Sequence, residues 1–188
     1  MLKIVTGIAK GKKIETLEGE LTRPTSQRIK EALFSSIQFD IENRRVLDLF
    51  AGSGQLGLEA LSRGADSVTF VDASREGMDV VKKNAKNTGF FERCRYAVSD
   101  YRNFIRKARE GEKYDLVFID PPYNMKACVE ALNRLVESEL LAPGAIVALE
   151  SGEEEIRADE LSGFDVIKST SYGKKSALNI LIYRGTDE

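Results

Sequence analysis

The 188-residue sequence contains no histidine and no tryptophan, and it has only two cysteines. The absence of histidine excludes serine–histidine triads, histidine proton shuttles and metal sites with histidine ligands. Cys94 and Cys128 are far apart in the sequence, which suits a reducing compartment, and two cysteines are too few for a typical four-ligand zinc site. Any reaction must therefore need little acid–base assistance, or it must borrow a reactive cofactor.

Long apolar runs are absent as well. No stretch approaches the ~20 apolar residues that span a bilayer, and residues 1–7 lack the apolar stretch of a signal peptide. The content of 42% apolar and 31% charged residues is typical of a globular protein, and the length fits one domain. We therefore expect a cytoplasmic, monomeric protein that uses neither a membrane nor a metal ion.

Charge is unevenly distributed along the chain. The net charge is −2, but residues 1–30 carry seven Lys or Arg side chains against three Glu. A basic N-terminal segment on an acidic body predicts an arm that contacts phosphates, although the same pattern also suits a solvated face. The candidate contacts are Lys10, Lys12, Lys13, Arg23 and Arg28.

Seven apolar runs recur along the rest of the chain, and helical patterns lie between the early ones. The first five runs are short and rich in Val, Ile, Leu and Phe, which is typical of strands buried on both faces. The predicted strands span residues 45–50, 67–72, 95–98, 115–120, 145–150, 164–167 and 177–183. The predicted helices span residues 55–63, 75–88, 102–110 and 126–141.

This alternation of strands and helices predicts a mostly parallel, seven-stranded Rossmann-like α/β sheet over residues 45–188. The short connection between the last two strands predicts a C-terminal antiparallel hairpin at one edge. Residues 1–44 form a separate basic extension in this prediction. There, residues 3–6 and 12–15 would pair as a small hairpin, and a helix would run from Pro24 to about Ile37 with Thr25 or Ser26 as its cap.

A glycine-rich loop joins the first predicted strand to the first helix. Gly52, Gly54 and Gly57 match G-x-G-x-x-G, and Asp72 ends the next strand, where it can bind ribose hydroxyls. A tight turn that needs positive φ is the alternative, and a P-loop is disfavoured because no Gly-Lys-Ser/Thr follows. Asp48, just ahead of the loop, would repel a pyrophosphate but favour the sulfonium and ammonium of S-adenosylmethionine. The loop therefore predicts a nucleotide-like ligand and favours S-adenosylmethionine over NAD.

Asp120-Pro121-Pro122-Tyr123 follows the fourth predicted strand, at the same edge of the sheet as the glycine loop. The prolines fix φ and remove backbone donors, and the aromatic ring can stack on a base. The Asp120 carboxylate and the Pro121 carbonyl could accept both hydrogens of an exocyclic base amine, which would aim its lone pair at an activated methyl. In isolation the motif could be a simple proline turn, but together with the glycine loop it predicts amine methylation.

At these residues the sequence resembles amino-methyltransferases with an (Asp/Asn/Ser)-Pro-Pro-(aromatic) motif. Within that group it is similar to the bacterial 16S rRNA (guanine(966)-N(2))-methyltransferase family, over nearly the whole chain. The Arg23-Pro24-Thr25 segment is the more family-specific part, and Gln55 and Ser176 depart from the usual small residue and threonine. The other matching segments are Gly7 with Gly11-Lys12, residues 28–34, residues 48–64 and Tyr172-Gly173-Lys174-Lys175-Ser176.

The resemblance implies a class I methyltransferase fold, S-adenosylmethionine as cofactor, and 16S rRNA in a 30S particle or assembly intermediate as substrate. It implies that the target guanine is held by Asp120, Pro121, Pro122 and Tyr123. It implies that the cofactor lies against Asp48, Phe50, Ala51, Gly52, Ser53, Gly54, Leu56, Gly57, Asp72, Ala73, Ser99, Asp100 and Tyr101, with Asp100 near the adenine. It adds Thr25 to the predicted RNA-contacting residues.

Three other functions remain open from the sequence. A DNA adenine-N6 or cytosine-N4 methyltransferase would share the chemistry, but 188 residues leave little room for a target-recognition domain. An NAD-linked oxidoreductase would share the glycine loop but would leave the two prolines unexplained. A non-catalytic RNA-binding module would account for the basic arm alone.

Overall fold

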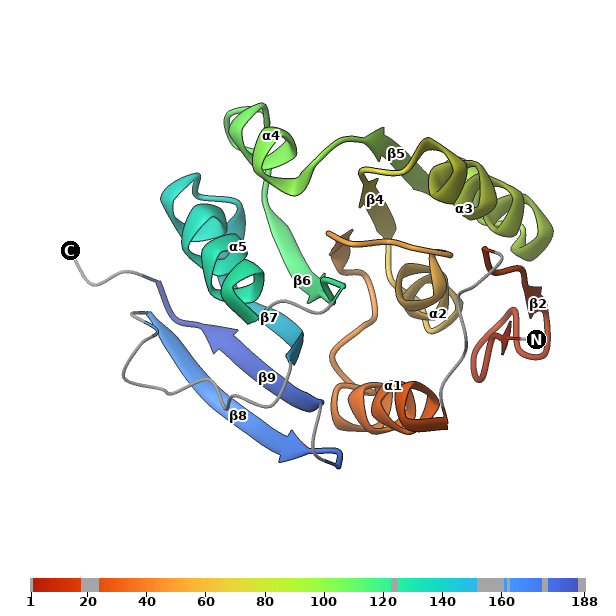
Figure 1. The fold of residues 1–188 in the computed structure, drawn as a ribbon, viewed down its shortest axis with the longest axis horizontal. Helices are drawn as coiled ribbons and strands as arrows, with labels where there is room; N and C mark the ends of the chain where they lie inside the picture. The colour runs from red at the N-terminus through yellow and green to blue at the C-terminus, as the bar shows by residue number, and fades with distance from the viewer. Residues whose placement is uncertain are drawn as a thin grey trace.

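The computed structural model describes residues 2–17, 24–122, 125–151, 161, 163–173 and 176–185. Its main element is a seven-stranded sheet with the strand order β5-β4-β3-β6-β7-β9-β8 (Figure 1). The strands are β3 (Arg45–Asp48), β4 (Ser67–Asp72), β5 (Cys94–Val98), β6 (Tyr114–Ile119), β7 (Leu141–Ser151), β8 (Phe164–Ser171) and β9 (Ala177–Tyr183). The helices are α1 (Pro24–Ser36), α2 (Gln55–Ser62), α3 (Arg75–Thr88), α4 (Tyr101–Arg106) and α5 (Met125–Glu137).

The predicted α/β fold class is confirmed. Strands β3 to β7 are mutually parallel, whereas β9 is antiparallel to both β7 and β8. The last two strands therefore form the expected antiparallel hairpin at one edge. β9 lies between β7 and β8. The outermost strand at this edge is therefore β8, which precedes β9 in the sequence.

Helices cover both faces of the sheet because its central strands are apolar on both sides. Apolar side chains of α1, α2 and α3 pack with one face of the sheet in a first core cluster. Those of α4 and α5 pack with the opposite face in a second cluster. The result is a three-layer arrangement, which Figure 1 shows with α1 and α4 on opposite sides of the strands.

Several predicted helix boundaries are wrong. Thr25 and Ser26 lie inside α1, so neither is its cap; Pro24 is the first helical residue, where a missing backbone N–H costs nothing. α4 ends at Arg106 instead of Glu110, because the chain turns toward β6. α5 ends at Glu137, and Leu141, predicted as helical, begins β7.

The N-terminal segment does not stand apart from the body. Strands β1 (Leu2–Lys3) and β2 (Lys13–Ile14) pair as a small antiparallel hairpin, and Ile4 and Ile14 belong to the first core cluster. The backbone N–H groups of Val5 and Thr6 donate to the buried Glu59 carboxylate of α2 at 2.8 and 3.0 Å. The boundary between residues 1–44 and 45–188 stays a prediction.

Glycine is required at one point of this contact. Gly7 has a φ of 86°, and a Cβ there would collide with the backbone carbonyl of Ser62. The neighbouring Ala9 N–H donates to Ser62 Oγ at 3.0 Å. The hairpin is therefore clamped to α2 at close backbone distance. Within the described ranges, no helix has the length and apolar character to cross a membrane.

Candidate active site

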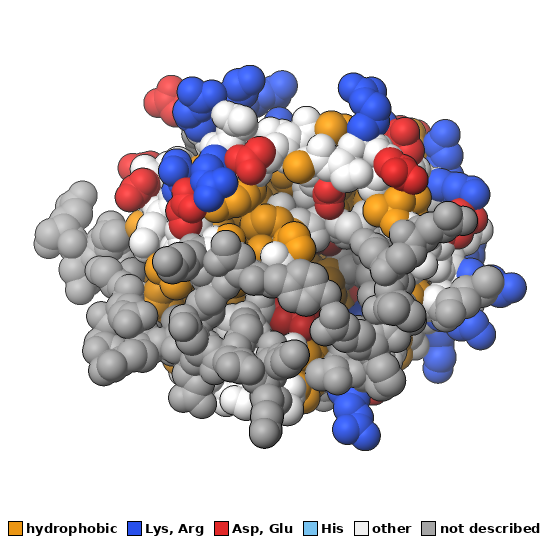
Figure 2. Space-filling view, viewed as in Figure 1, with side chains coloured by type: hydrophobic (Ala, Val, Ile, Leu, Met, Phe, Trp, Pro, Cys, Tyr) orange, Lys and Arg blue, Asp and Glu red, His pale blue; other side chains and the backbone are white. Residues whose placement is uncertain are grey.

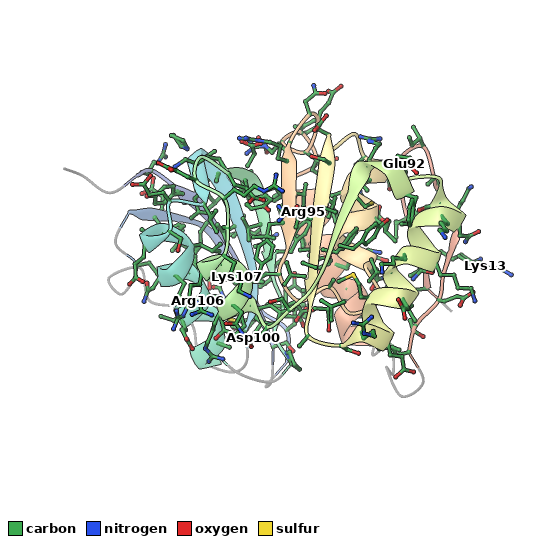
Figure 3. The ribbon with its side chains drawn as sticks, turned by 90° about the horizontal axis from the view of Figure 1, so that it is seen from above. Lys13, Glu92, Arg95, Asp100, Arg106 and Lys107 are labelled. Atoms are coloured by element: carbon green, nitrogen blue, oxygen red, sulfur yellow. The ribbon has the colours of Figure 1, made fainter. Side chains whose placement is uncertain are left out.

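The parallel strands place five acidic residues along one edge of the sheet. Asp48, Asp72 and Glu150 lie at the carboxyl ends of β3, β4 and β7, and Asp100 and Asp120 follow β5 and β6. Carboxyl ends of parallel strands share one edge, which is where open α/β sheets bind ligands. Figure 3 shows Asp100 at this edge, where β5 leads into α4.

The glycine loop has the backbone conformation that its sequence predicts. Gly52 and Gly54 have φ values of 52° and 78°, in the left-handed region that favours glycine. Gly57 has a different role, because a Cβ there would lie 2.7 Å from Phe70 Cζ and 2.8 Å from Val68 Cγ1. The third glycine of the motif thus lets α2 pack closely on β4.

Asp72 holds the loop in place. Its Oδ2 accepts a hydrogen bond from the Gly52 N–H at 2.8 Å, and its Oδ1 accepts one from the Ser74 N–H at 2.8 Å. Ala51 N–H donates to the Val71 carbonyl at 2.9 Å. These bonds fix the loop beside Ala73, which is exposed.

Asp48 is a buried carboxylate under the loop, with 2% of its surface exposed. It accepts one hydrogen bond, from the Gly57 N–H at 3.1 Å. Its pKa is raised to about 7, mainly by burial and also by the negative charges of Asp120 and Asp72, while the Gly57 hydrogen bond acts in the opposite direction. A nearby positive charge would stabilise the ionised form of this carboxyl group.

The residues after β5 include Asp100, whose predicted contact with the adenine of the cofactor stays a prediction. Asp100 caps α4 by accepting from the Arg102 N–H at 2.9 Å, and the Ser99 N–H donates to the Asp72 carbonyl at 2.8 Å. The Tyr101 side chain is buried against Phe50, with ring centroids 5.1 Å apart. Its hydroxyl donates to Glu130, and this hydrogen bond joins α4 to α5.

Two further predicted residues lie inside the loop region. Ser53 is buried, and Leu56 packs at the margin of the first core cluster. The Ser53 carbonyl accepts a hydrogen bond from Asn84 Nδ2 of α3 at 2.9 Å. Neither side chain is therefore exposed on the open surface, and a contribution of this pair to cofactor binding stays a prediction.

Asp120, Pro121 and Pro122 form a corner after β6, called the proline corner here; Asp120 and Pro122 are exposed and Pro121 is buried. Asp48 of β3 pairs with Phe118 of β6, two residues before Asp120, which places the proline corner beside the strand that leads into the glycine loop. Tyr123 lies outside the described residues. In the portion of the chain that the structure describes, no group of three or more Cys, Asp and Glu side chains could hold a metal ion.

Glu150 is an acidic residue at this edge that the sequence reasoning did not single out. It is half-buried, and burial together with the charge of Asp120 raises its pKa to about 8. Its position was available from the sequence, because it ends an apolar strand in the same way as Asp72 and Asp120. The pattern that pointed to those two residues applied equally to Glu150.

The predicted RNA-contacting residues lie partly within the described structure. Lys10, Lys12, Lys13 and Arg28 are exposed, Arg23 lies outside the described residues, and the side chain of Thr25 is not described. Figure 2 shows Lys and Arg side chains projecting from the edge where Figure 1 places α3 and β2. The exposure of these four side chains is compatible with RNA contact, which stays a prediction.

Asn84 connects this basic hairpin to the glycine loop. Its Nδ2 donates to the carbonyls of Glu15 and Ser53, both at 2.9 Å, and its Oδ1 accepts from the Glu15 N–H at 2.9 Å. Lys12 Nζ also donates to the Asn87 carbonyl near the end of α3. One buried amide thus ties the hairpin to the loop.

Comparison with known proteins places this geometry in a family. A family model described as "Conserved hypothetical protein 95" matches residues 2–181. The chain belongs to this family. The chain is 34% identical over 151 residues to "Ribosomal RNA small subunit methyltransferase D" of Haemophilus influenzae, covering 80% of this chain and 78% of that protein. It is 34% identical over 150 residues to the Escherichia coli protein of the same name, covering 80% and 74%.

A solved structure supports the same assignment. Escherichia coli yhhF, described as a "putative methyltransferase", superposes with a TM-score of 0.85 at 30% sequence identity, covering 98% of this chain and 99% of that one. The family membership agrees with the resemblance found in the sequence, and the fold is that of methyltransferases.

Proposed function

We propose that this protein is an S-adenosylmethionine-dependent rRNA methyltransferase that methylates the N2 amine of one guanine in 16S rRNA. The observation that supports this most directly is the adjacency of the Asp120-Pro121-Pro122 corner and the glycine loop at one sheet edge. The relatives named as small-subunit rRNA methyltransferases supply the substrate class.

The residues at the loop fit S-adenosylmethionine. The buried Asp48 carboxyl group, whose pKa is raised to about 7, gains from a cationic ligand and would disfavour a pyrophosphate. The positive-φ glycines leave the backbone open to close approach. When bound, this cofactor supplies a methyl group already activated by its sulfonium, so the chain needs no histidine.

The proline corner would prepare the amine. An exocyclic amine is a weak nucleophile because its lone pair is delocalised into the base. The Asp120 carboxylate and the Pro121 carbonyl would accept its two hydrogens and favour a pyramidal nitrogen. Most of the acceleration would then come from positioning and electrostatics. Tyr123 would stack on the base, as its aromatic character suggests.

The N-terminal segment would recognise the RNA. In this proposal, residues 1–44 form the RNA-contacting part and residues 45–188 the catalytic domain. Lys10, Lys12, Lys13 and Arg28, with Arg23 and Thr25, would contact phosphates. The substrate would be a 30S particle or an assembly intermediate, whose shape supplies specificity that a small enzyme lacks. The protein would act in the cytoplasm as a monomer without a metal ion.

Transfer of a radiolabelled methyl group tests this proposal. The protein should label the 16S rRNA of 30S particles and should leave duplex DNA unlabelled. Labelling of DNA but not of 30S particles would favour a DNA amine methyltransferase instead. In parallel calorimetry, binding of S-adenosylmethionine is expected; tight binding of NAD without S-adenosylmethionine binding would favour an oxidoreductase.

A further inference from the structure

Glu150 and Asp120 lie side by side on neighbouring parallel strands. Ile119 of β6 pairs with Leu149 of β7, so the next residue of each chain segment is one of these two acids. Adjacent strands are ~4.8 Å apart. The two carboxylates also interact electrostatically, and Asp120 raises the pKa of Glu150.

Both side chains point toward the face of the sheet that α1, α2 and α3 cover. Side chains alternate along a strand, and Ala148 belongs to the first core cluster whereas Leu149 belongs to the second, which places Glu150 on the first side. Phe118 belongs to the first cluster, so the same alternation places Asp120 there. Electrostatic interactions of Asp120 extend to Asp48 and Glu150, and the charges of Asp120 and Glu150 also raise the pKa of Cys128 on α5, so both acids lie at the open end of the sheet edge.

The backbone that presents Glu150 is firmly held. The Glu150 carbonyl accepts a contact from Cys128 Sγ of α5 at 3.6 Å. The next residue, Ser151, is buried and accepts from Asn179 Nδ2 of β9 at 3.1 Å. Glu150 itself pairs across the sheet with the apolar Leu178. The backbone at Glu150 is therefore held by two elements, α5 and β9, and its carboxyl group lies within electrostatic reach of Asp120.

We propose that Glu150 accepts the N1–H of the target guanine and so determines base specificity at this site. This inference rests on the proposed function. The edge of guanine that carries N2 has three N–H hydrogens: one on N1 and two on N2. Glu150, Asp120 and the Pro121 carbonyl would be three matching acceptors. Adenine and cytosine present an acceptor nitrogen next to their amine, which the ionised form of Glu150, the form that bound N–H donors favour, would repel.

The N–H groups of a bound guanine would also reduce the repulsion between the Asp120 and Glu150 carboxylates. Two carboxylates on adjacent strands repel each other, and each N–H donor that they accept stabilises the ionised form. A hydrogen bond to a charged group is stronger than one between neutral groups, and an acceptor that faces another acceptor loses that contribution. This asymmetry gives Glu150 a strong preference for a base with N1–H.

The test uses 30S particles assembled around 16S rRNA with guanine or 2-aminopurine at the target position. 2-Aminopurine keeps the N2 amine, but its N1 is an acceptor without hydrogen. The wild-type protein should prefer guanine by roughly 10- to 100-fold in kcat/KM. Glu150→Gln should reduce this preference at least tenfold, because an amide can donate to N1. Glu137→Gln, at the exposed end of α5, is the matched control and should keep the wild-type ratio.

The ratio of kcat/KM for guanine to kcat/KM for 2-aminopurine does not depend on the fraction of the protein that is folded. The missing O6 of 2-aminopurine is common to the wild-type and Glu150→Gln measurements, so it does not change the comparison between them. An unchanged ratio in Glu150→Gln, with guanine methylated by the wild type, would overturn the role of Glu150 and leave the proposed function intact. If Glu150→Gln methylates neither guanine nor 2-aminopurine, Glu150→Asp should restore methylation of guanine but not of 2-aminopurine. A Glu150→Asp protein that methylates neither base overturns the inference. A wild-type protein that methylates no guanine would instead refute the proposed function.

Discussion

The two halves of the sheet edge are built differently. On the half formed by β3, β4 and β5, backbone N–H groups donate to Asp48, Asp72 and Asp100. On the half formed by β6 and β7, Asp120 and Glu150 face each other, and Asp120 raises the pKa of its neighbour. The first half is a preorganised cradle, whereas the second brings two carboxyl groups close together.

This difference indicates which half binds the cofactor and which acts on the base. A cradle held by its own hydrogen bonds keeps its shape before any ligand arrives, as cofactor binding requires. A group of acceptors is best satisfied by a ligand rich in N–H donors. Variants in the two halves should therefore have separable effects, and the predictions below test this separation in order of decreasing effect.

The largest effect is expected for Asp120→Ala. Loss of the carboxylate that aligns the amine should reduce methyl transfer by about a thousandfold or more, since positioning and electrostatics supply most of the rate. The affinity for S-adenosylmethionine should change by less than about threefold. Asp165→Ala, on the exposed strand β8, is the control and should retain full activity. Methyl transfer by Asp120→Ala at the wild-type rate would remove Asp120 from the mechanism.

Asp48→Asn should show the reverse separation. Loss of the charge should weaken S-adenosylmethionine binding by roughly 10- to 100-fold, or about 1.4–2.7 kcal/mol. Calorimetry should also show that the affinity of the wild type for S-adenosylmethionine increases as the pH is raised from about 5 to about 7, because the cationic ligand prefers ionised Asp48. The affinity of Asp48→Asn should not depend on pH in this range.

Asp48→Asn also tests how the free energy of unfolding of the ligand-free protein depends on pH. The folded pKa of Asp48, about 7, lies above its ordinary value of 3.8. Stability from this group is therefore present at low pH and is lost as the pH rises from about 4 to about 7. Denaturant unfolding should show the wild type losing stability relative to Asp48→Asn across that window. Parallel curves for the two proteins would contradict the raised pKa.

Gly57→Ala tests the rigidity of the cradle. The added methyl would lie 2.7 Å from Phe70 Cζ, and overpacking of this kind costs about 1–3 kcal/mol of unfolding free energy. Gly77→Ala is the control, since its nearest neighbour atom lies 3.4 Å away and alanine favours the helix. Thermal unfolding compares the two variants. Equal stability for both would mean that Gly57 is not needed for packing.

The smallest effect is expected from the N-terminal hairpin. Replacing Lys10, Lys12 and Lys13 with glutamine should weaken RNA binding and reduce the salt slope by about 2, since each phosphate contact contributes about 0.7–0.9. Replacing Arg106 and Lys107 at the end of α4, which Figure 3 shows well away from Lys13, is the control. An unchanged slope in the triple variant would assign these lysines to ordinary surface charge.

Sequence patterns predicted the sheet and its hairpin because buried strands and helices have distinct apolar periods. The ends of α4 and α5 were misplaced, since they depend on how the chain turns to reach β6 and β7. The structure shows the loop glycines and Asp48 together at the predicted edge, whereas whether they contact the cofactor remains a prediction. The inward role of Tyr101 could not be predicted, because its partner Glu130 lies 29 residues away.

Mass spectrometry of nucleosides from 16S rRNA tests the central claim most directly. Cells that lack the gene should lose N2-methylguanosine at one position of the small-subunit rRNA. The wild-type gene should restore the modification, whereas Asp120→Ala should fail to restore it. An unchanged N2-methylguanosine content in cells without the gene would contradict the assignment of this protein as a guanine-N2 methyltransferase of 16S rRNA.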